Sequence, residues 1–295
     1  MHNHVVESIN SAFIFGIILN GLFVVLEFLV GFFVGSIGLI SDAGHNLSDI
    51  ISLILAMLAI GLSKLRPNTR YTYGYKKTTV LASLINALLL MMVIIFIFYE
   101  SVVKIVNPVK VEGEIISITA AIGVAIKGIS TFLFHRDKER DLNIKGVYLH
   151  MLADTLVGLG VVVSGLIMKF TQWYFIDGIV GLLISIVILV STWSLLAKSF
   201  RLTLDGVPHG INTEKIISVI EKTKGVQNLH HLHLWAISTR ENALTAHIVA
   251  DDLNNMEQIK KEIKNQLSTE GITHITLEFE TEGVACKDKS IIAQD

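Results

Sequence analysis

Cysteine, proline and charge are all scarce in this sequence. Cys286 is the only cysteine, so no disulfide can form within the chain. Only three of the 295 residues are prolines. Charged residues make up 17% of the chain, against about 25% in soluble domains. The formal net charge of −2 argues against a nucleic-acid partner.

Long apolar runs take the place of the missing charges. Residues 78–98 and 178–197 contain no charged residue at all, and runs of about 20 apolar residues are typical of transmembrane helices. The sequence therefore predicts an integral membrane protein. The first apolar run lacks a small-residue cleavage site after it, which indicates a retained helix and not a signal peptide. Six membrane helices are expected, at 11–34, 38–62, 78–103, 113–134, 145–169 and 174–199.

The distribution of basic residues predicts how the chain crosses the membrane. The loops after the second and fourth helices are rich in them: Lys64, Arg66, Arg70, Lys76 and Lys77, then Arg136, Lys138, Arg140 and Lys145. The opposite side holds only Lys104, Lys110 and Lys169. Basic loops stay in the cytoplasm, so both loops and both termini are expected there. The absence of a long loop or targeting extension favours a bacterial inner membrane.

From about Asp205 the composition changes to that of a small domain in water. Residues 213–225 and 255–271 have helical patterns, the latter with apolar residues at three- and four-residue spacing: Met256, Ile259, Ile263 and Leu267. Strand patterns cover 228–238, 242–252 and 272–280. The order is α-β-β-α-β, a ferredoxin-like α+β domain beside an all-α membrane domain. About 75 residues make a modest core, so dimerisation would help stability.

These observations predict four segments. A cytoplasmic N-terminal tail covers 1–10, and the six-helix transport domain covers 11–204. The cytoplasmic domain, expected to bind metal and to dimerise, covers 205–282, and a polar tail covers 283–295.

Two expected membrane helices carry the same polar pattern. The second has His45-x-x-x-Asp49 and the fifth has His150-x-x-x-Asp154, and a spacing of four places both side chains on one helix face. If the two faces meet, two nitrogens and two oxygens converge, a set that suits a tetrahedral divalent ion, zinc above all. Hydrogen bonding in a helix interface is the alternative, but ionisable residues inside a membrane are functional candidates by default. Two identical pairs favour a metal site.

Other polar residues in these helices have two interpretations each. Asp42, one turn before His45, either supports a metal ligand or lies near the outer end of its helix. Three more either line a polar path or pack between helices: Asn20, Glu27 and Asn86. Glu100 and Lys104 are four apart and predict an interfacial ion pair, and Asp177 is expected at the water boundary.

The motifs together resemble the cation diffusion facilitator family of zinc transporters. They are SIGLISDAGHNLSD, RYTYGYKK, HMLADTLVGLGVVVSG, the pattern GVxxxHxLHLW and LTAHI. The resemblance covers nearly the whole chain and implies a homodimer that exports metal from the cytoplasm, driven by inward proton flow. It implies His45, Asp49, His150 and Asp154 as the transport site. Histidine in the first pair resembles the zinc-preferring members.

The resemblance also implies a metal site in the cytoplasmic domain. His230 and His247 match ligand positions of the family, and Glu280 matches a third. His231, His233 and His274 are nearby alternatives, and a surface of exposed imidazoles without metal is another interpretation. Strand alternation predicts His231 and His233 on one face and His230 on the other. His2 and His4 are candidate additional ligands.

Two departures from the family bear on metal capture. The loop between the fourth and fifth helices has only His135, so a histidine-rich collecting loop is not expected. The loop after the second helix has no His, Asp, Glu or Cys, so no metal site is expected there.

The expected mechanism is alternating access with proton exchange, because protons compete with metal for the same ligands. No cofactor is expected; zinc is the transported and regulatory ion, with Cd²⁺, Co²⁺, Mn²⁺ and Fe²⁺ as further candidates. The other partners are protons, membrane lipid and a second copy of the chain. An intramembrane metalloenzyme is disfavoured, since no His-Glu-x-x-His is present and four protein ligands leave no place for water. A metal-gated channel or sensor remains the rival.

Overall fold

A computed structural model describes residues 11–134 and 142–281 of the chain. Within these ranges, the side chains of 11–20, Asp49, Leu53, 130–134, 142–151 and Leu253 are not described. The predictions for His2, His4, His135, Cys286 and both tails therefore lie outside the described residues.

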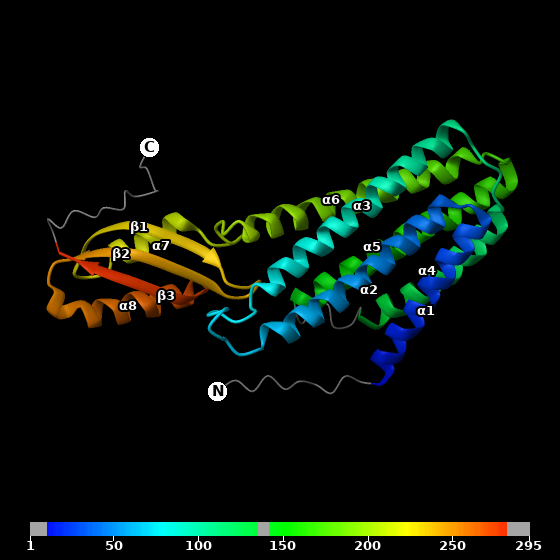
Figure 1. The fold of residues 1–295 in the computed structure, drawn as a ribbon. Coiled ribbons are helices and arrows are strands. Elements are labelled where there is room, and N and C mark those ends of the chain that lie inside the picture. The colour runs from blue at the N-terminus through cyan, green and yellow to red at the C-terminus, as the bar shows by residue number, and fades with distance from the viewer. Residues whose placement is uncertain (1–10, 135–141, 282–295) are drawn as a thin grey trace. The chain divides into compact units, whose positions relative to one another are not determined.

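Six long helices form the membrane part of the chain (Figure 1). They are α1 (Ser11–Val34), α2 (Ile37–Ser63), α3 (Thr78–Val106), α4 (Gly113–Phe134), α5 (Leu142–Thr171) and α6 (Phe175–Thr203). Each expected helix is present, with ends shifted by a few residues. Among the described residues, four stretches are long and apolar enough to cross a membrane: 37–63, 78–106, 152–171 and 175–203.

The chain divides into two compact units. One contains Met1–Leu53 and Leu88–Trp193, and the other contains Ile54–Ala87 and Ser194–Asp295. The positions of both four-residue polar patterns lie in the first unit. The second unit joins the C-terminal domain to the nearby ends of α2, α3 and α6.

Helix α2 begins where Asp177 of α6 caps it. Asp177 is 1% exposed and accepts hydrogen bonds from Ser36 Oγ at 2.5 Å, Ile37 N at 2.7 Å and Gly38 N at 3.1 Å. A carboxylate at this place satisfies amides that lack partners within the helix and meets the positive end of its dipole. The spacing that suggested a Glu100–Lys104 pair was misleading, because Lys104 instead donates to Asp177 at 3.2 Å and to the Gly35 carbonyl.

Helices α4 and α5 pack closely along each other, and glycine permits the contact. A Cβ on Gly113 would collide with the Gly165 carbonyl, and a Cβ on Gly165 would collide with Ser117. Small residues at such crossings let membrane helices approach at van der Waals distance. This contact fixes the position of α5, which carries Asp154.

The C-terminal domain has the predicted order: α7 (Thr213–Glu221), β1 (Val226–Ala236), β2 (Asn242–Ala250), α8 (Met256–Thr269) and β3 (Ile272–Glu280), with a short 3₁₀ turn at Leu253–Asn255. Strand β2 is central, antiparallel to β1 and parallel to β3. Both helices pack against the sheet (Figure 1), and their apolar faces fill its core with Ile216, Ile220, Ile259, Ile263 and Leu267. Met256 begins α8 and is 38% exposed, so it is not part of that core.

Candidate metal centres

The two polar patterns meet through a contact between α2 and α5. His45 Nε2 lies 3.2 Å from Asp154 Oδ1, and both side chains are mostly buried, at 14% and 15% exposure. Asp49 and His150 occupy helical positions one turn from His45 and Asp154, but their side chains lie outside the described residues. The structure thus brings together one nitrogen and one oxygen donor from the two helices.

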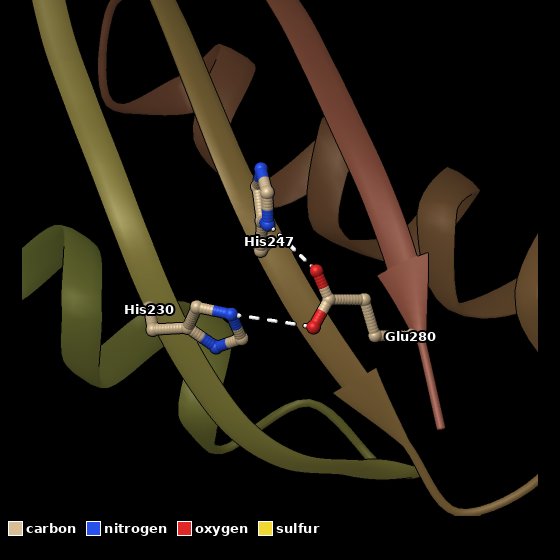
Figure 2. A group of neighbouring side chains, drawn as sticks. All are labelled: His230, His247 and Glu280. Carbon is tan, nitrogen blue, oxygen red and sulfur yellow. Dashed lines mark hydrogen bonds and ion pairs between the residues drawn. The ribbon is translucent and has the colours of Figure 1, made fainter. Parts of the chain in front are cut away.

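A second cluster of donors lies in the sheet of the C-terminal domain. His230 of β1 stands opposite His247 of β2, and both side chains point toward Glu280 at the end of β3 (Figure 2). The carboxylate of Glu280 bridges the two rings. Its Oε1 lies 2.7 Å from His247 Nδ1, and its Oε2 lies 3.3 Å from His230 Nε2. We call these three residues the sheet triad.

The sheet triad has the composition of a metal site. One ligand atom from each residue lies within 4.8 Å of the other two, and no other such group of three occurs among the side chains that the structure describes. The three residues are 11–20% exposed, so the site is shielded but reachable. Two nitrogens and one oxygen would leave one of zinc's four tetrahedral positions for a further ligand.

A bulge in β1 changes where the neighbouring histidines lie. Between His230 and His233 the register with β2 shifts, and His231 has a φ of 52°. The extra residue interrupts the strand alternation, so the rings of His230 and His231 lie 5.3 Å and 4.8 Å from that of His247. The prediction that His230 and His231 face opposite sides is therefore wrong.

The other candidate donors of the domain differ in their distance from the sheet triad. His233 Nε2 lies 3.2 Å from His231 Nε2, next to the triad. His274 packs edge-on against Tyr73, with ring centroids 5.3 Å apart, so it is not in the cluster. Glu278, which sequence reasoning missed, lies 3.5 Å from His247 Nε2. The strand alternation of β3 puts it on the face of Glu280.

Comparison with known proteins decides the family. The cation efflux transmembrane domain matches residues 13–202, and the cytoplasmic domain of cation efflux proteins matches residues 208–282. The chain belongs to the cation efflux family. It is an integral membrane protein of a family of transporters. The predicted family and the predicted fold class are both confirmed.

Three bacterial relatives illustrate the similarity of this cation efflux protein. It is 33% identical to the "cadmium, cobalt and zinc/H(+)-K(+) antiporter" of Bacillus subtilis strain 168, over 95% of this chain and 92% of the relative. It is 35% identical to the "metal cation efflux system protein CzcD" of Cupriavidus metallidurans, over 89% and 84% of the two chains. It is 31% identical to the "zinc transporter ZitB" of Escherichia coli K12, over 88% and 83%.

The sequence did not predict one buried ion pair of this cation efflux protein. Lys127 of α4 donates to both carboxylate oxygens of Asp42, at 2.9 and 3.0 Å, and Asn46 donates to Asp42 Oδ1 at 3.3 Å. Asp42, in the second turn of α2, is therefore buried and held by Lys127. The signal was a lone lysine in the apolar run AIGVAIKGIS, which requires a partner inside a membrane.

The remaining polar candidates are distributed over the whole membrane part. Glu27 is fully buried beside the Lys127–Asp42 pair. Asn86 is also buried, but it belongs to the other compact unit. The side chain of Asn20 lies outside the described residues.

Proposed function

We propose that this protein exports Zn²⁺ from the cytoplasm in exchange for protons, by alternating access. The transport site is made of His45 and Asp49 of α2 and His150 and Asp154 of α5. The observation that carries the proposal is the 3.2 Å contact between His45 Nε2 and Asp154 Oδ1, which joins the two helices that carry the paired pattern. Membership of the cation efflux family supports it.

The donor set explains why zinc and protons exchange. Zinc accepts imidazole nitrogen and carboxylate oxygen at about 2.0–2.2 Å in a tetrahedron. These ligands bind metal only as neutral imidazoles and ionised carboxylates, so every proton that occupies them competes with the ion. The two aspartates neutralise the charge of the ion, and protons take over that role when the ion leaves. A more acidic exterior therefore favours release outside.

The proposed range of ions is wider than zinc. The names of two relatives include cadmium and cobalt or metal cations in general, and nitrogen and oxygen donors suit several divalent first-row ions. Zinc is the main substrate, because the mixed set provides its preferred tetrahedron. Cd²⁺, Co²⁺, Mn²⁺ and Fe²⁺ are the further candidates, and no resident cofactor is proposed.

The orientation follows from the basic loops, with both termini in the cytoplasm of a bacterial cell and the helices in its plasma membrane. Contacts of the loop after α2 support it: Lys76 Nζ lies 2.5 Å from Glu241, and Lys77 Nζ lies 2.5 Å from Asp205. That loop and the C-terminal domain therefore share one side of the membrane. The bacterial origin of the relatives supports the plasma membrane.

The C-terminal domain is proposed to dimerise and to sense cytoplasmic zinc through the sheet triad. Its core consists of two short helices on three strands, and small domains of this size gain stability from association. Zinc bound by ligands of β1, β2 and β3 would favour the arrangement of strands that binds it best. The triad thus links cytoplasmic zinc to the state of the transporter.

The test is counterflow in proteoliposomes that hold the purified full chain. Zinc flux and internal pH are followed together, with zinc on one side and an opposing pH gradient. We expect zinc movement to acidify the compartment that zinc leaves, and a larger pH gradient to accelerate the flux. Zinc flux with no proton movement would instead favour a metal-gated channel, because a channel needs no exchanged proton. If the folded protein moved no zinc at all, a metal sensor would be the remaining alternative function.

A further inference from the structure

A group of charged side chains is buried between α1, α2 and α4. Glu27 is 0% exposed and Asp42 is 1% exposed. Lys127 is 7% exposed and donates to Asp42 at 2.9 and 3.0 Å. None of the three belongs to the proposed transport site, and charged groups at such depth are costly unless they are neutralised.

The charges of this group do not balance if every residue is ionised. Lys127 and Asp42 form a close pair with both oxygens engaged, so their charges cancel. Neither oxygen of Glu27 accepts a hydrogen bond from a donor group of the described residues. Its charged neighbours are Asp42 and Lys127. Asp42 repels an ionised Glu27 and can share a hydrogen bond with it only when one of the two carboxyls carries a proton, and Lys127 is already engaged by Asp42. Glu27 Oε1 otherwise faces Gly123 of α4, which offers no donor from a side chain. A proton on Glu27 removes the imbalance.

The group lies next to the proposed transport site. Asp42 is one turn before His45 on α2. On α5, the position of a Cβ at Gly158 is 3.7 Å from Asp42 Oδ2, and Gly158 is one turn after Asp154. Asp42 thus neighbours Glu27 and also lies within about one helical turn of both His45 on α2 and Asp154 on α5.

We infer that Glu27 binds a proton of the transport cycle at a place separate from the metal ligands. The inference rests on the proposed exchange of zinc for protons. When zinc has left and protons balance only part of the charge of the transport-site carboxylates, the remaining negative charge disfavours a further one nearby, and Glu27 keeps its proton. When zinc enters, its two positive charges cancel theirs, and the Glu27 carboxyl releases H⁺ toward the cytoplasm. After zinc leaves, a proton from the exterior returns to Glu27.

This arrangement couples two ions that never share a ligand. If bound zinc lowers the affinity of Glu27 for a proton, then a proton on Glu27 lowers the affinity of the transport site for zinc by the same factor. Among the described residues, the charged groups that face Glu27 are Asp42 from α2 and Lys127 from α4. The Lys127–Asp42 pair has no net charge, so it does not offset the effect of the zinc charge on Glu27.

Infrared difference spectra of the full chain in lipid test the inference without transport. The spectrum with zinc minus the spectrum without zinc should show loss of the C=O stretch of a protonated carboxylic acid. Part of that loss should be missing in Glu27→Gln, since an amide carries no such proton. In Glu27→Asp the band should remain and shift, and this variant also serves if Glu27→Gln does not fold. Glu114→Gln, at a 61% exposed glutamate, is the matched control and should match the wild type.

Counterflow separates failure of the inference from failure of the proposed function. Protons moved per zinc ion should fall in Glu27→Gln and stay unchanged in Glu114→Gln. A wild type that moves no protons with zinc refutes the proposed function. A wild type that exchanges, with an unchanged ratio and an unchanged infrared band in Glu27→Gln, refutes the inference, because Glu27 would then be a permanently protonated or permanently ionised residue.

Discussion

Zinc binding at the sheet triad should raise the thermal stability of the C-terminal domain by a measurable amount. In a tetrahedral zinc site, ligand atoms are about 3.3 Å apart, from metal–ligand distances of about 2.0–2.1 Å. The ligand atoms of His230, His247 and Glu280 already lie within 4.8 Å of one another. The site therefore needs only a small contraction, and little binding energy is lost in ordering it.

The size of the effect follows from mass action. With free zinc at about 100 times the dissociation constant, binding to the folded state adds about 2.7 kcal/mol. For a domain of this size, that corresponds to a rise of about 10–20 °C in the melting temperature, at about 4–8 °C per kcal/mol. The gain should shrink as the pH falls, because protons compete with zinc for the imidazole nitrogens.

The assay is thermal unfolding of the fragment 205–295, which contains its own apolar core, with and without zinc. The double substitution His230→Ala and His247→Ala should remove most of the gain. His274→Ala is the matched control, since His274 lies away from the sheet triad against Tyr73. The assignment of this site would be refuted if zinc did not change the melting temperature, or if the double variant kept the full rise in melting temperature.

Three further predictions concern the membrane part. His45→Asp removes an imidazole from the tetrahedral set and should loosen the site, so the flux of the larger cadmium ion should rise relative to zinc flux in vesicles; an unchanged ratio places selectivity elsewhere. Lys127→Met leaves Asp42 buried without its cation and should cost about 3–5 kcal/mol of stability, measured as thermal unfolding in detergent, whereas the double variant with Asp42→Asn should recover part of it. Asp177→Ala removes the cap of α2 and should cost about 1–2 kcal/mol in the same assay, and an unaltered melting temperature would show that water replaces the cap.

The sequence predicted those features that depend on local pattern. The six helices follow from apolar runs, and the order of the C-terminal elements follows from two periodicities, 3.6 and 2, which are visible in one strand or helix at a time. The contact of His45 with Asp154 was predictable for a different reason. The same four-residue spacing occurs on two helices, and a shared function requires that the two faces meet.

The features that were missed depend on contacts between distant segments. The bulge at His231 arises from the pairing of β1 with β2, which strand alternation alone does not reveal. Glu100 is four residues from Lys104 and could pair with it. Asp177, however, accepts hydrogen bonds from the amides at the start of α2, and Lys104 pairs with Asp177. Lys127 and Asp42 are 85 residues apart, and neither residue indicates the other before the helices are packed.

The most direct test of the central claim is zinc uptake into inside-out membrane vesicles, with and without an acidic interior, for the wild type and for Asp154→Ala. The acidic interior takes the place of the acidic exterior of the cell. Wild-type uptake should rise with the pH gradient, and Asp154→Ala should remain at background although it is present in the membrane and folded. Zinc uptake at the wild-type rate in Asp154→Ala would contradict a transport site built from His45, Asp49, His150 and Asp154.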